Sequence, residues 1–437
     1  MKKLVFKIPR AIYYMDFFEP LKSLFKWFSG KGKSGPKVQE FEEAFKQLFG
    51  HEHLTIMPHA RVSLYFCLKS YEYDLGDEVL MTPVNLPDMV NMIRICGLRE
   101  RYVDINRHDY SIDLEDAKNK LSTRTKFLFV THLNGIVPDM DAILKFAGDH
   151  NLILIQDCTQ SIDCRYNGKR LETYSELSFM ALCDLKVIHT HMGGMIVSQN
   201  SERLKRIKKI ADAELLPLSP KYLFRFVAED MIANILLNRV LFSIIIFPIM
   251  RFLTIMLGAN NIQGLTRGDG LKIGNIIILK SIFGGGGNLL RESVPDYMLY
   301  RFSTLQAEIG LKRLRKFKEI DQKRIENSKK FHEFLDIGDK YTAKYEDDRT
   351  HVYWKFPIIV KDYERLHDHL CRFGIDSARS NLPCLSTLEH FKGGDQTPNA
   401  EFMVNSSLYI PLHYYLNDKE ISFIAGKVTE FFSDGSL

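Results

Sequence analysis

Between Gly35 and Ser198, short apolar runs alternate with segments of helix length, and this alternation restricts the fold more than any other feature of the chain. Helical patterns such as "ARVSLYFCLKSY" and "LPDMVNMIRICG" separate the runs, which read "HLTIMP", "GDEVLMTP", "RERYVDI", "TKFLFVTHL" and "LILIQDC". Nearly continuous apolar strands are typical of a parallel sheet that helices cover on both faces. The pattern therefore predicts an α/β fold with a mostly parallel sheet, whose ligands bind at the carboxyl ends of the strands.

Flanking segments refine this prediction. The stretch "GPKVQEFEEAFKQLFG" has apolar residues at helical spacing between a proline and a glycine, which predicts an amphipathic helix within residues 35–50. The runs "LSFMALC" and "GGMIVSQ" predict an antiparallel pair of strands. A long helical pattern at 300–335 is followed by "THVYWKFPIIV", "YERLHDHLCRFG", "SLYIPLH" and "DKEISFIAGKVTEFF". This tail predicts a smaller α+β unit.

A chain of 437 residues exceeds the usual size of one domain, so we expect two packed units. The patterns place a large domain at 35–320 and a small C-terminal domain at 321–437. Residues 1–34 form an amphipathic N-terminal extension that lacks the apolar core and small-residue cleavage site of a signal peptide.

The segment 222–257 departs from the alternating pattern because it is almost entirely apolar. It reads "YLFRFVAEDMIANILLNRVLFSIIIFPIMRFLTIML", and only eleven uninterrupted residues separate Arg239 from Arg251, too few to cross a bilayer. Three interpretations remain open: a helical hairpin in a membrane interface, a buried subunit interface, or a pair of ordinary core helices. The N-terminal "FFEPLKSLFKWF" is a candidate to dock beside this insertion. The glycines at 283–288 predict a hinge after it.

Charge and cysteine content exclude several classes of protein. The 59 basic and 54 acidic residues give a formal net charge of +5, too small for nucleic acid to be the main partner. The seven cysteines form no CxxC pair, so we expect neither a disulfide framework nor a zinc site. A reducing cytoplasmic environment fits this usage best.

Three polar residues follow strand-like runs at positions where a cofactor could be held. Asp157 ends the run "LILIQD", Gln160 follows it, and Lys186 comes after the next predicted strand. An aspartate that pairs with a pyridinium nitrogen and a lysine that forms an imine are the two requirements of an enzyme that uses pyridoxal 5'-phosphate (PLP). Asp157 taken alone is also compatible with a simple cap on the next element.

The part of the chain that contains Asp157 and Lys186 resembles a known family. The run "QDCTQSIDCRYNGKRLETYSELSFMALCDLKVIHTHMGGMIV" is similar to the DegT/StrS sugar aminotransferases, which are PLP enzymes of fold type I, the aspartate aminotransferase-like fold. The resemblance continues through "GPKVQEFEEAF", "LGDEVLMTP", "THLNGIVPDMDAI", "YRFSTLQAEIGL" and "SLYIPLHYYL". It covers nearly all of residues 35–432, apart from the apolar insertion and the residues after it up to about 290.

The resemblance implies a role for each of the three polar residues. Lys186 falls on the Schiff-base lysine, Asp157 on the partner of the pyridine nitrogen, and Gln160 on the residue beside the phenolic oxygen of the cofactor. An ionised aspartate keeps the ring nitrogen protonated, so that the ring accepts electrons. The lysine, once released from the cofactor, is suited to serve as the base for the proton shift.

Other positions depart from the family pattern. His59, Ala60 and Arg61 stand where the family has a serine, a glycine and a threonine around the phosphate. Ala181 replaces a serine, Leu86 replaces the aromatic residue that stacks on the ring, and Leu299 replaces an asparagine contributed by the partner subunit. Arg61 either replaces the lost phosphate donors at the start of a helix or is an ordinary surface charge.

The histidines His132, His189 and His191 lack a carboxylate at fitting spacing, so we expect no metal site, and we expect His189 and His191 to line the pocket beside Lys186. The resemblance implies a homodimeric, cytoplasmic aminotransferase in surface polysaccharide synthesis. Its substrates would be a nucleotide-linked keto sugar and an amino donor, glutamate. Residues 222–257 would give peripheral membrane contact. The alternative is a catalytically degenerate relative that binds a partner or a membrane.

Overall fold

The computed structural model describes residues 6–14, 16, 18–28, 35–183, 185–257, 272–273, 276–277, 290–338, 341–343, 346, 348–380 and 382–433. The hinge predicted at 283–288 lies outside these residues.

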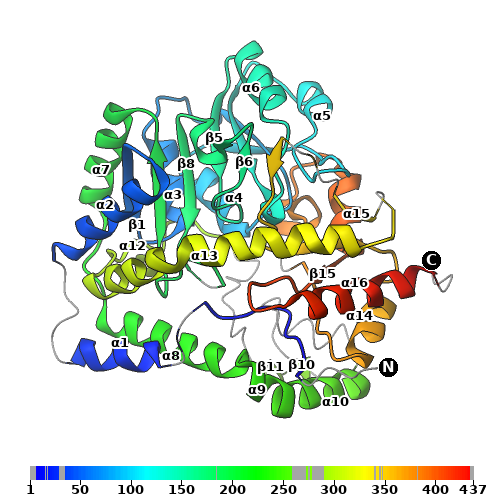
Figure 1. Cartoon of the computed structure of the whole chain (residues 1–437). Helices are drawn as coiled ribbons and strands as arrows, with labels where there is room; N and C mark the ends of the chain where they lie inside the picture. The colour runs from blue at the N-terminus through cyan, green and yellow to red at the C-terminus, as the bar shows by residue number, and fades with distance from the viewer. Residues whose placement is uncertain are drawn as a thin grey trace.

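A seven-stranded sheet forms the centre of the molecule, with the strand order β1-β9-β8-β5-β4-β2-β3 (Figure 1). Strands β2, β3, β4, β5 and β8 run parallel, whereas β9 runs antiparallel to both β8 and β1. This arrangement confirms the predicted mostly parallel sheet and the predicted antiparallel pair. The strands are β1 (His53–Met57), β2 (Glu78–Met81), β3 (Arg99–Tyr102), β4 (Thr125–Thr131), β5 (Ile153–Asp157), β8 (Leu177–Ala181) and β9 (Gly194–Ser198).

Helices cover both faces of this sheet because its side chains alternate between two cores. In β5, Leu154 packs into one core and Ile155 into the other. The first core lies under α2 (Lys37–Phe49), α6 (Met140–Asp149) and α13 (Thr304–Phe334). The second lies under α3 (Ala60–Lys69), α4 (Pro87–Ile95) and α7 (Ser201–Glu214). Helix α2 lies within the stretch predicted from its sequence.

The C-terminal part has its own sheet and its own core. Strands β13 (Phe356–Ile359), β15 (Ser407–Ile410) and β14 (Ala378–Arg379) pair antiparallel, and α14 (Tyr363–Arg372) and α16 (Asp418–Ser433) pack against them. Helix α13 contributes Phe317 to the large-domain core and Phe331 to this one. The boundary predicted at residue 320 falls inside this continuous helix.

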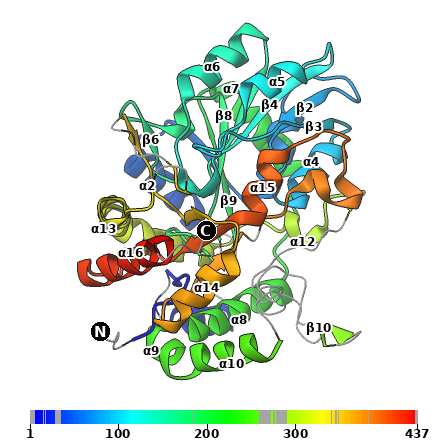
Figure 2. The same cartoon turned by 90° about the vertical axis from the view of Figure 1, so that its right-hand side faces the viewer.

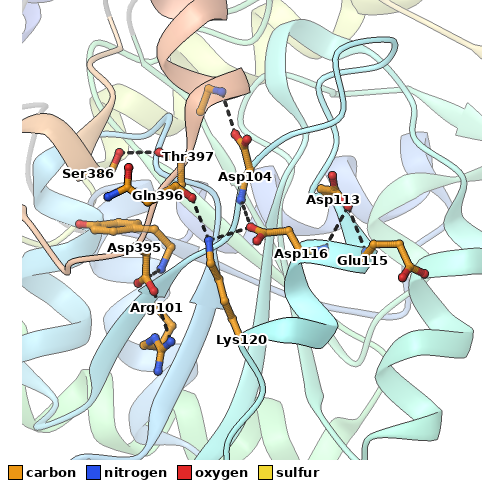
Figure 3. Close-up of polar contacts among 12 residues, drawn as sticks. Arg101, Asp104, Asp113, Glu115, Asp116, Lys120, Ser386, Asp395, Gln396 and Thr397 are labelled. Atoms are coloured by element: carbon orange, nitrogen blue, oxygen red, sulfur yellow. Dashed lines mark hydrogen bonds and ion pairs between the residues drawn. The ribbon is translucent and has the colours of Figure 1, made fainter.

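Polar contacts fasten the two parts together where β3 meets α15 (Pro398–Ser406) (Figure 3). The carboxylate of Asp104 accepts the backbone N–H groups of Asn399 and Ala400 at 2.9 and 2.8 Å, so it caps α15 from the large domain. The Lys120 ammonium lies 2.7 Å from Asp116 and donates to the Gln396 carbonyl at 3.1 Å. The contacts of Asp104 and Lys120 with residues 396–400 thus tie the start of α15 to the large domain.

The N-terminal extension and the apolar insertion lie together at one end of the molecule (Figures 1 and 2). Helix α1 (Glu19–Phe28) packs along α8 (Pro220–Leu236), as we expected for the N-terminal segment. After α8, a short α9 (Arg239–Leu241) continues through a π-helical turn (Phe242–Ile246) into α10 (Phe247–Leu257). Arg251 pairs with Asp368 at 2.6 Å and Arg239 pairs with Glu420, so this helix lies against the C-terminal domain.

The interpretation of the insertion as ordinary core helices is wrong for α9 and α10. Among the described residues, the stretch Arg239–Met256 is long and apolar enough to meet the length and composition criteria for a membrane span, and 11% of it is buried. Core helices bury most of their apolar side chains, and this one does not. We define the apolar face as Phe18, Leu21, Phe25, Phe224, Ile232, Ile235, Val240, Ile244, Ile245, Ile249, Phe252, Ile255 and Met256, all of which are exposed.

Candidate active site

Lys186 lies in the loop 182–193, which connects the antiparallel strands β8 and β9. Its side chain is buried, and Nζ lies 3.7 Å from the ring centroid of Trp354. A cation over an indole ring is attracted by the negative face of the ring. The indole N–H of Trp354 donates to the Leu185 carbonyl at 3.3 Å, so the same side chain holds the loop and contacts the amine.

Asp157 ends β5 and lies in the same buried region as Lys186. Its carboxylate accepts the backbone N–H of Thr159 at 2.9 Å. Burial raises the pKa of Asp157, while the hydrogen bonds from Thr159 and the charge of Lys186 oppose this increase. The lysine is therefore close enough to act on the carboxyl group electrostatically.

Gln160 is held by the turn that follows β4. Its side-chain oxygen accepts the backbone N–H of Asn134 at 2.8 Å. Gly135 has φ of 75°, and a Cβ atom there would lie 2.7 Å from the Gln160 carbonyl oxygen, so the turn requires glycine at this position. The close approach of the two loops fixes the amide at the carboxyl edge of the sheet.

The start of α3 lies against β9. His59 precedes the helix, and Ala60 and Arg61 form its first turn. A Cβ atom on Gly194 would lie 2.4 Å from the carbonyl carbon of His59. Gly194 pairs with Ala181 across the sheet, so the helix start, Ala181 and the ends of the lysine loop lie in one neighbourhood.

Because of this close approach, we expect Gly194→Ala to lower the free energy of unfolding by about 1–3 kcal/mol, the usual cost of overpacking. Urea denaturation measures the change. Gly148→Ala is the matched control, since Gly148 is exposed on α6 and a methyl group there would meet no atom within 4 Å. We expect that control to be neutral or stabilising by up to about 1 kcal/mol. Equal stability of the two variants would contradict the tight packing of β9 on α3.

Arg61 takes part in a charge cluster beside the helix start. Its Nη1 lies 3.3 Å from Asp88, and Arg291 Nε lies 2.6 Å from the same carboxylate. Two guanidinium groups thus share one carboxylate, which leaves an excess positive charge. His59 adds none, because burial and the nearby Arg61 lower its pKa to about 3. An anion at this helix start would meet backbone amides and a net positive charge.

Two further positions singled out in the sequence have apolar surroundings. Leu86 precedes α4 and packs at the edge of the second core, while Ala181 ends β8 and is buried in the same core. Neither side chain offers a hydrogen bond. The site therefore contains a lysine, a carboxylate, an amide and a helix start that attracts anions. Apolar side chains lie near this helix start.

Lys355 and Trp354 are site residues that the sequence pattern did not reveal. Lys355 Nζ lies 4.5 Å from the Trp354 ring centroid, and its pKa is lowered to about 7 by burial and then by the charges of Lys186 and Arg10. A cavity of about 200 Å³ is lined by Leu185, Trp354 and Lys355. Tryptophan occurs only twice in the chain, which was the available signal.

The histidines behave differently from one another. His132 Nε2 lies 2.8 Å from the Gln156 side-chain oxygen, and burial lowers its pKa to about 4, which makes it a neutral core residue. His189 and His191 are buried in the lysine loop, where they contact Asp230 of α8. Local spacing could not reveal this carboxylate, because α8 supplies it from about 40 residues further along the chain.

The described residues fit an aromatic aldehyde that carries a phosphate. The buried amine of Lys186 is suited to the aldehyde, Asp157 to a ring nitrogen, and the excess charge around Arg61 to the phosphate. The fit lacks the aromatic stacking partner, since Leu86 occupies that position.

The sequence profile of the DegT/DnrJ/EryC1/StrS aminotransferase family matches residues 25–216 and 294–429. An uncharacterised protein of Methanocaldococcus jannaschii is 22% identical over 413 residues, which cover 92% of this chain and 91% of that protein. GDP-perosamine synthase of Vibrio cholerae is 28% identical over 174 residues, 40% of this chain and 47% of the synthase. The match therefore spans about half of this named relative.

Solved structures share the fold. The sugar aminotransferase CalS13 from Micromonospora echinospora has a TM-score of 0.70 at 17% identity, covering 97% of this chain and 99% of that one. The Helicobacter pylori aminotransferase PseC, involved in the biosynthesis of pseudoaminic acid, has a TM-score of 0.66 at 17% identity, covering 99% and 100%. The predicted fold class is confirmed.

Proposed function

Because the chain belongs to the DegT/DnrJ/EryC1/StrS aminotransferase family, we propose that it is a PLP-dependent enzyme that transfers an amino group from glutamate to a nucleotide-linked keto sugar. The product would be an amino sugar for a surface polysaccharide. A synthase of GDP-perosamine and a spore coat polysaccharide protein of Bacillus subtilis among the relatives support this substrate class. The single observation that carries the proposal is the buried Lys186 amine, whose charge acts on the buried Asp157 carboxyl group at the end of β5.

Each site residue has a proposed task. Lys186 would hold the cofactor and move a proton at Nζ, and Trp354 would keep that amine oriented. The Asp157 carboxylate would accept a hydrogen bond from the ring nitrogen, and Gln160 would contact the phenolic oxygen. The backbone amides of Ala60 and Arg61, together with the Arg61 guanidinium, would bind the phosphate. When bound, PLP supplies an aldehyde that carries the amino group and a ring that withdraws electrons.

Amino transfer from 15N-labelled glutamate tests this function. Purified protein is incubated with PLP, labelled glutamate and each of a set of nucleotide-linked 3-keto and 4-keto sugars, and the products are weighed by mass spectrometry. We expect one sugar to gain the labelled amino group while glutamate becomes 2-oxoglutarate. Absence of labelled sugar from the whole set, with PLP bound to the protein, would contradict the proposed substrate class.

A second candidate function is a degenerate scaffold without turnover. The observation that favours it is the contact between the insertion and the helix start, where Tyr222 Oη lies 3.3 Å from His59 Nε2. Asp88 also compensates part of the charge of Arg61. Failure of the protein to bind PLP at all would support this candidate.

For the assembly, we propose a homodimer, as the family resemblance implies. Its substrate cleft would then include residues of both subunits. Size-exclusion chromatography with light scattering measures the mass, and a monomer at micromolar concentration would contradict this proposal.

We also propose that the enzyme is cytoplasmic and lies on the membrane through its apolar face. Helices α9 and α10 are fixed to the C-terminal domain by Arg239 and Arg251, so they would lie in the plane of the bilayer and not cross it. Exposed Lys22, Lys221 and Arg225 on the neighbouring helices suit anionic headgroups.

Liposome flotation tests the membrane proposal. We expect the protein to float with phosphatidylglycerol vesicles, and Ile249→Asp/Phe252→Asp to reduce the floating fraction about tenfold or more, since each exposed side chain gains over 1 kcal/mol on burial. Leu75→Asp is the control, because Leu75 is also exposed but lies outside the apolar face. Recovery of all three proteins in the soluble fraction would exclude the bilayer as the partner of this face.

A further inference from the structure

A buried polar cluster joins the lysine loop to two segments outside the family match. His189 and His191 belong to the loop 182–193, Tyr13 to the N-terminal extension, and Asp230 to α8. All four residues are buried. The family match begins at residue 25 and is interrupted between 216 and 294, so Tyr13 and Asp230 lie outside the residues that the family profile matches.

The Asp230 carboxylate is the centre of this cluster. The Tyr13 hydroxyl donates to Oδ1, His189 Nε2 lies 3.1 Å from Oδ2, and His191 Nδ1 contacts Oδ2 as well. Burial would raise the pKa of Asp230, but the interactions with the two histidines lower it below its ordinary value. The group therefore stays a carboxylate and accepts hydrogen bonds on both oxygens.

The loop that Asp230 contacts has a strained backbone. Leu185 and His191 have φ of 61° and 65°, a left-handed conformation that costs non-glycine residues of order 1–3 kcal/mol and persists only where surrounding contacts fix it. Trp354 bonds the backbone at Leu185, and Asp230 holds the side chain of His191. Lys186 lies between these two fixed points.

We propose that Asp230 is a positioning residue for Lys186. Its hydrogen bonds to His189 and His191 hold the loop 182–193 in the conformation that brings the lysine amine to Asp157. Helix α8 of the apolar insertion would thus stabilise the lysine loop of the active site. This inference rests on the proposed role of Lys186 in amino transfer.

The same donors include metal ligands, since atoms of His189, His191 and Asp230 lie within 4.8 Å of one another. Around a tetrahedral zinc ion with bonds of about 2.0–2.1 Å, neighbouring donor atoms stand about 3.3 Å apart. Here His189 Nε2 lies 3.1 Å from Asp230 and 2.8 Å from the Tyr13 oxygen, which are hydrogen-bonding distances. Metal analysis of the purified protein distinguishes a hydrogen-bonded cluster from one that holds an ion.

Asp230→Ala, Asp230→Asn and the control Glu229→Gln test the proposal. Glu229 is the preceding residue of α8 and pairs with Arg225 at the surface, so the control removes a carboxylate without touching the loop. Hydrogen exchange of the loop amides, measured without added PLP, reports on whether Asp230 holds the loop. In the loaded enzyme, the ratio of kcat to KM and the near-visible absorption of bound cofactor report on Lys186.

We expect Asp230→Ala to accelerate loop exchange more than tenfold and to lower kcat about 100-fold with little change in KM, the loss typical of a reacting group displaced by about 1 Å. Asp230→Asn keeps one acceptor oxygen and should lie between Asp230→Ala and the wild type. Glu229→Gln should match the wild type. If Asp230→Ala does not fold, Asp230→Asn, which conserves size, decides by the same measurements.

Loop exchange and kcat that stay at wild-type values in the Asp230 variants would overturn the proposal. So would one equivalent of zinc in the wild-type protein that Asp230→Ala loses, because the cluster would then be a metal site. If the wild type binds no PLP, the proposed function fails. Unchanged loop exchange in the Asp230 variants would separately refute the proposal that Asp230 holds the loop.

Discussion

Lys186→Ala is expected to lower kcat by about 1,000-fold or more, because one side chain both anchors the cofactor and transfers the proton. The near-visible absorption of the wild-type protein mixed with PLP should disappear in the variant. Stopped assays of labelled amino transfer and absorption spectra measure the two effects on the same samples.

Lys169→Ala is the matched control, since Lys169 is an exposed lysine of the short strand β7 (Lys169–Arg170). That variant should keep wild-type activity and absorption. If Lys186→Ala retains the absorption band, the cofactor is held by another amine, and Lys355, which also contacts the Trp354 ring, would be the next to test.

Asp157→Asn is expected to have opposite effects on activity and stability. Activity should fall about 100- to 1,000-fold, the usual cost of removing one preorganised electrostatic partner of a reacting group. The melting temperature of the protein without cofactor should rise at pH 7. Burial raises the pKa of Asp157, so the folded chain holds this proton more tightly than the unfolded chain, and ionisation costs stability that the neutral amide does not lose.

The raised pKa of Asp157 also sets the pH range in which Asp157→Asn is more stable than the wild type. Stability is lost as the pH rises from the unfolded pKa of about 4 through the raised folded value, so wild type and Asp157→Asn should converge near pH 4 and separate above it. Asp74→Asn is the control, since Asp74 is exposed between α3 and β2, and it should change neither activity nor this pH profile. Melting curves from pH 4 to pH 8 check the prediction. A variant less stable than the wild type at pH 7 would contradict it.

The sheet could be predicted from the sequence because both of its faces are buried, which makes most of its strands largely apolar. The edge strand β3, which reads RERY, is the exception. The order of the motifs predicted Asp157 and Lys186 as site residues, and in the structure both side chains are buried, with the charge of Lys186 opposing the raised pKa of Asp157. Trp354 could not be placed in the same way, because it reaches the lysine loop from beyond α13. Its contact depends on tertiary packing that no local spacing encodes.

The tertiary contacts of the insertion could not be predicted from the sequence either. Its apolar composition left a membrane interface, a subunit interface and ordinary core helices as open interpretations, and only the exposure of α9 and α10 in the structure argues against the last of these. Asp230, however, lies in the run "FVAEDMIANI" beside Glu229, and nothing in the order of residues distinguishes the carboxylate that turns inward from the one that faces solvent. The distinction comes from helix rotation, which places residues one position apart about 100° from each other.

Helix α13 has 31 residues and, at about 1.5 Å per residue, spans roughly 45 Å. It is a single unbroken rod embedded in the hydrophobic interiors of both domains. Any opening of the cleft for sugar entry would have to bend this rod or slide the small domain along it. Product release is therefore expected to depend on movements of the loops around the cleft, while the large and small domains keep their relative position.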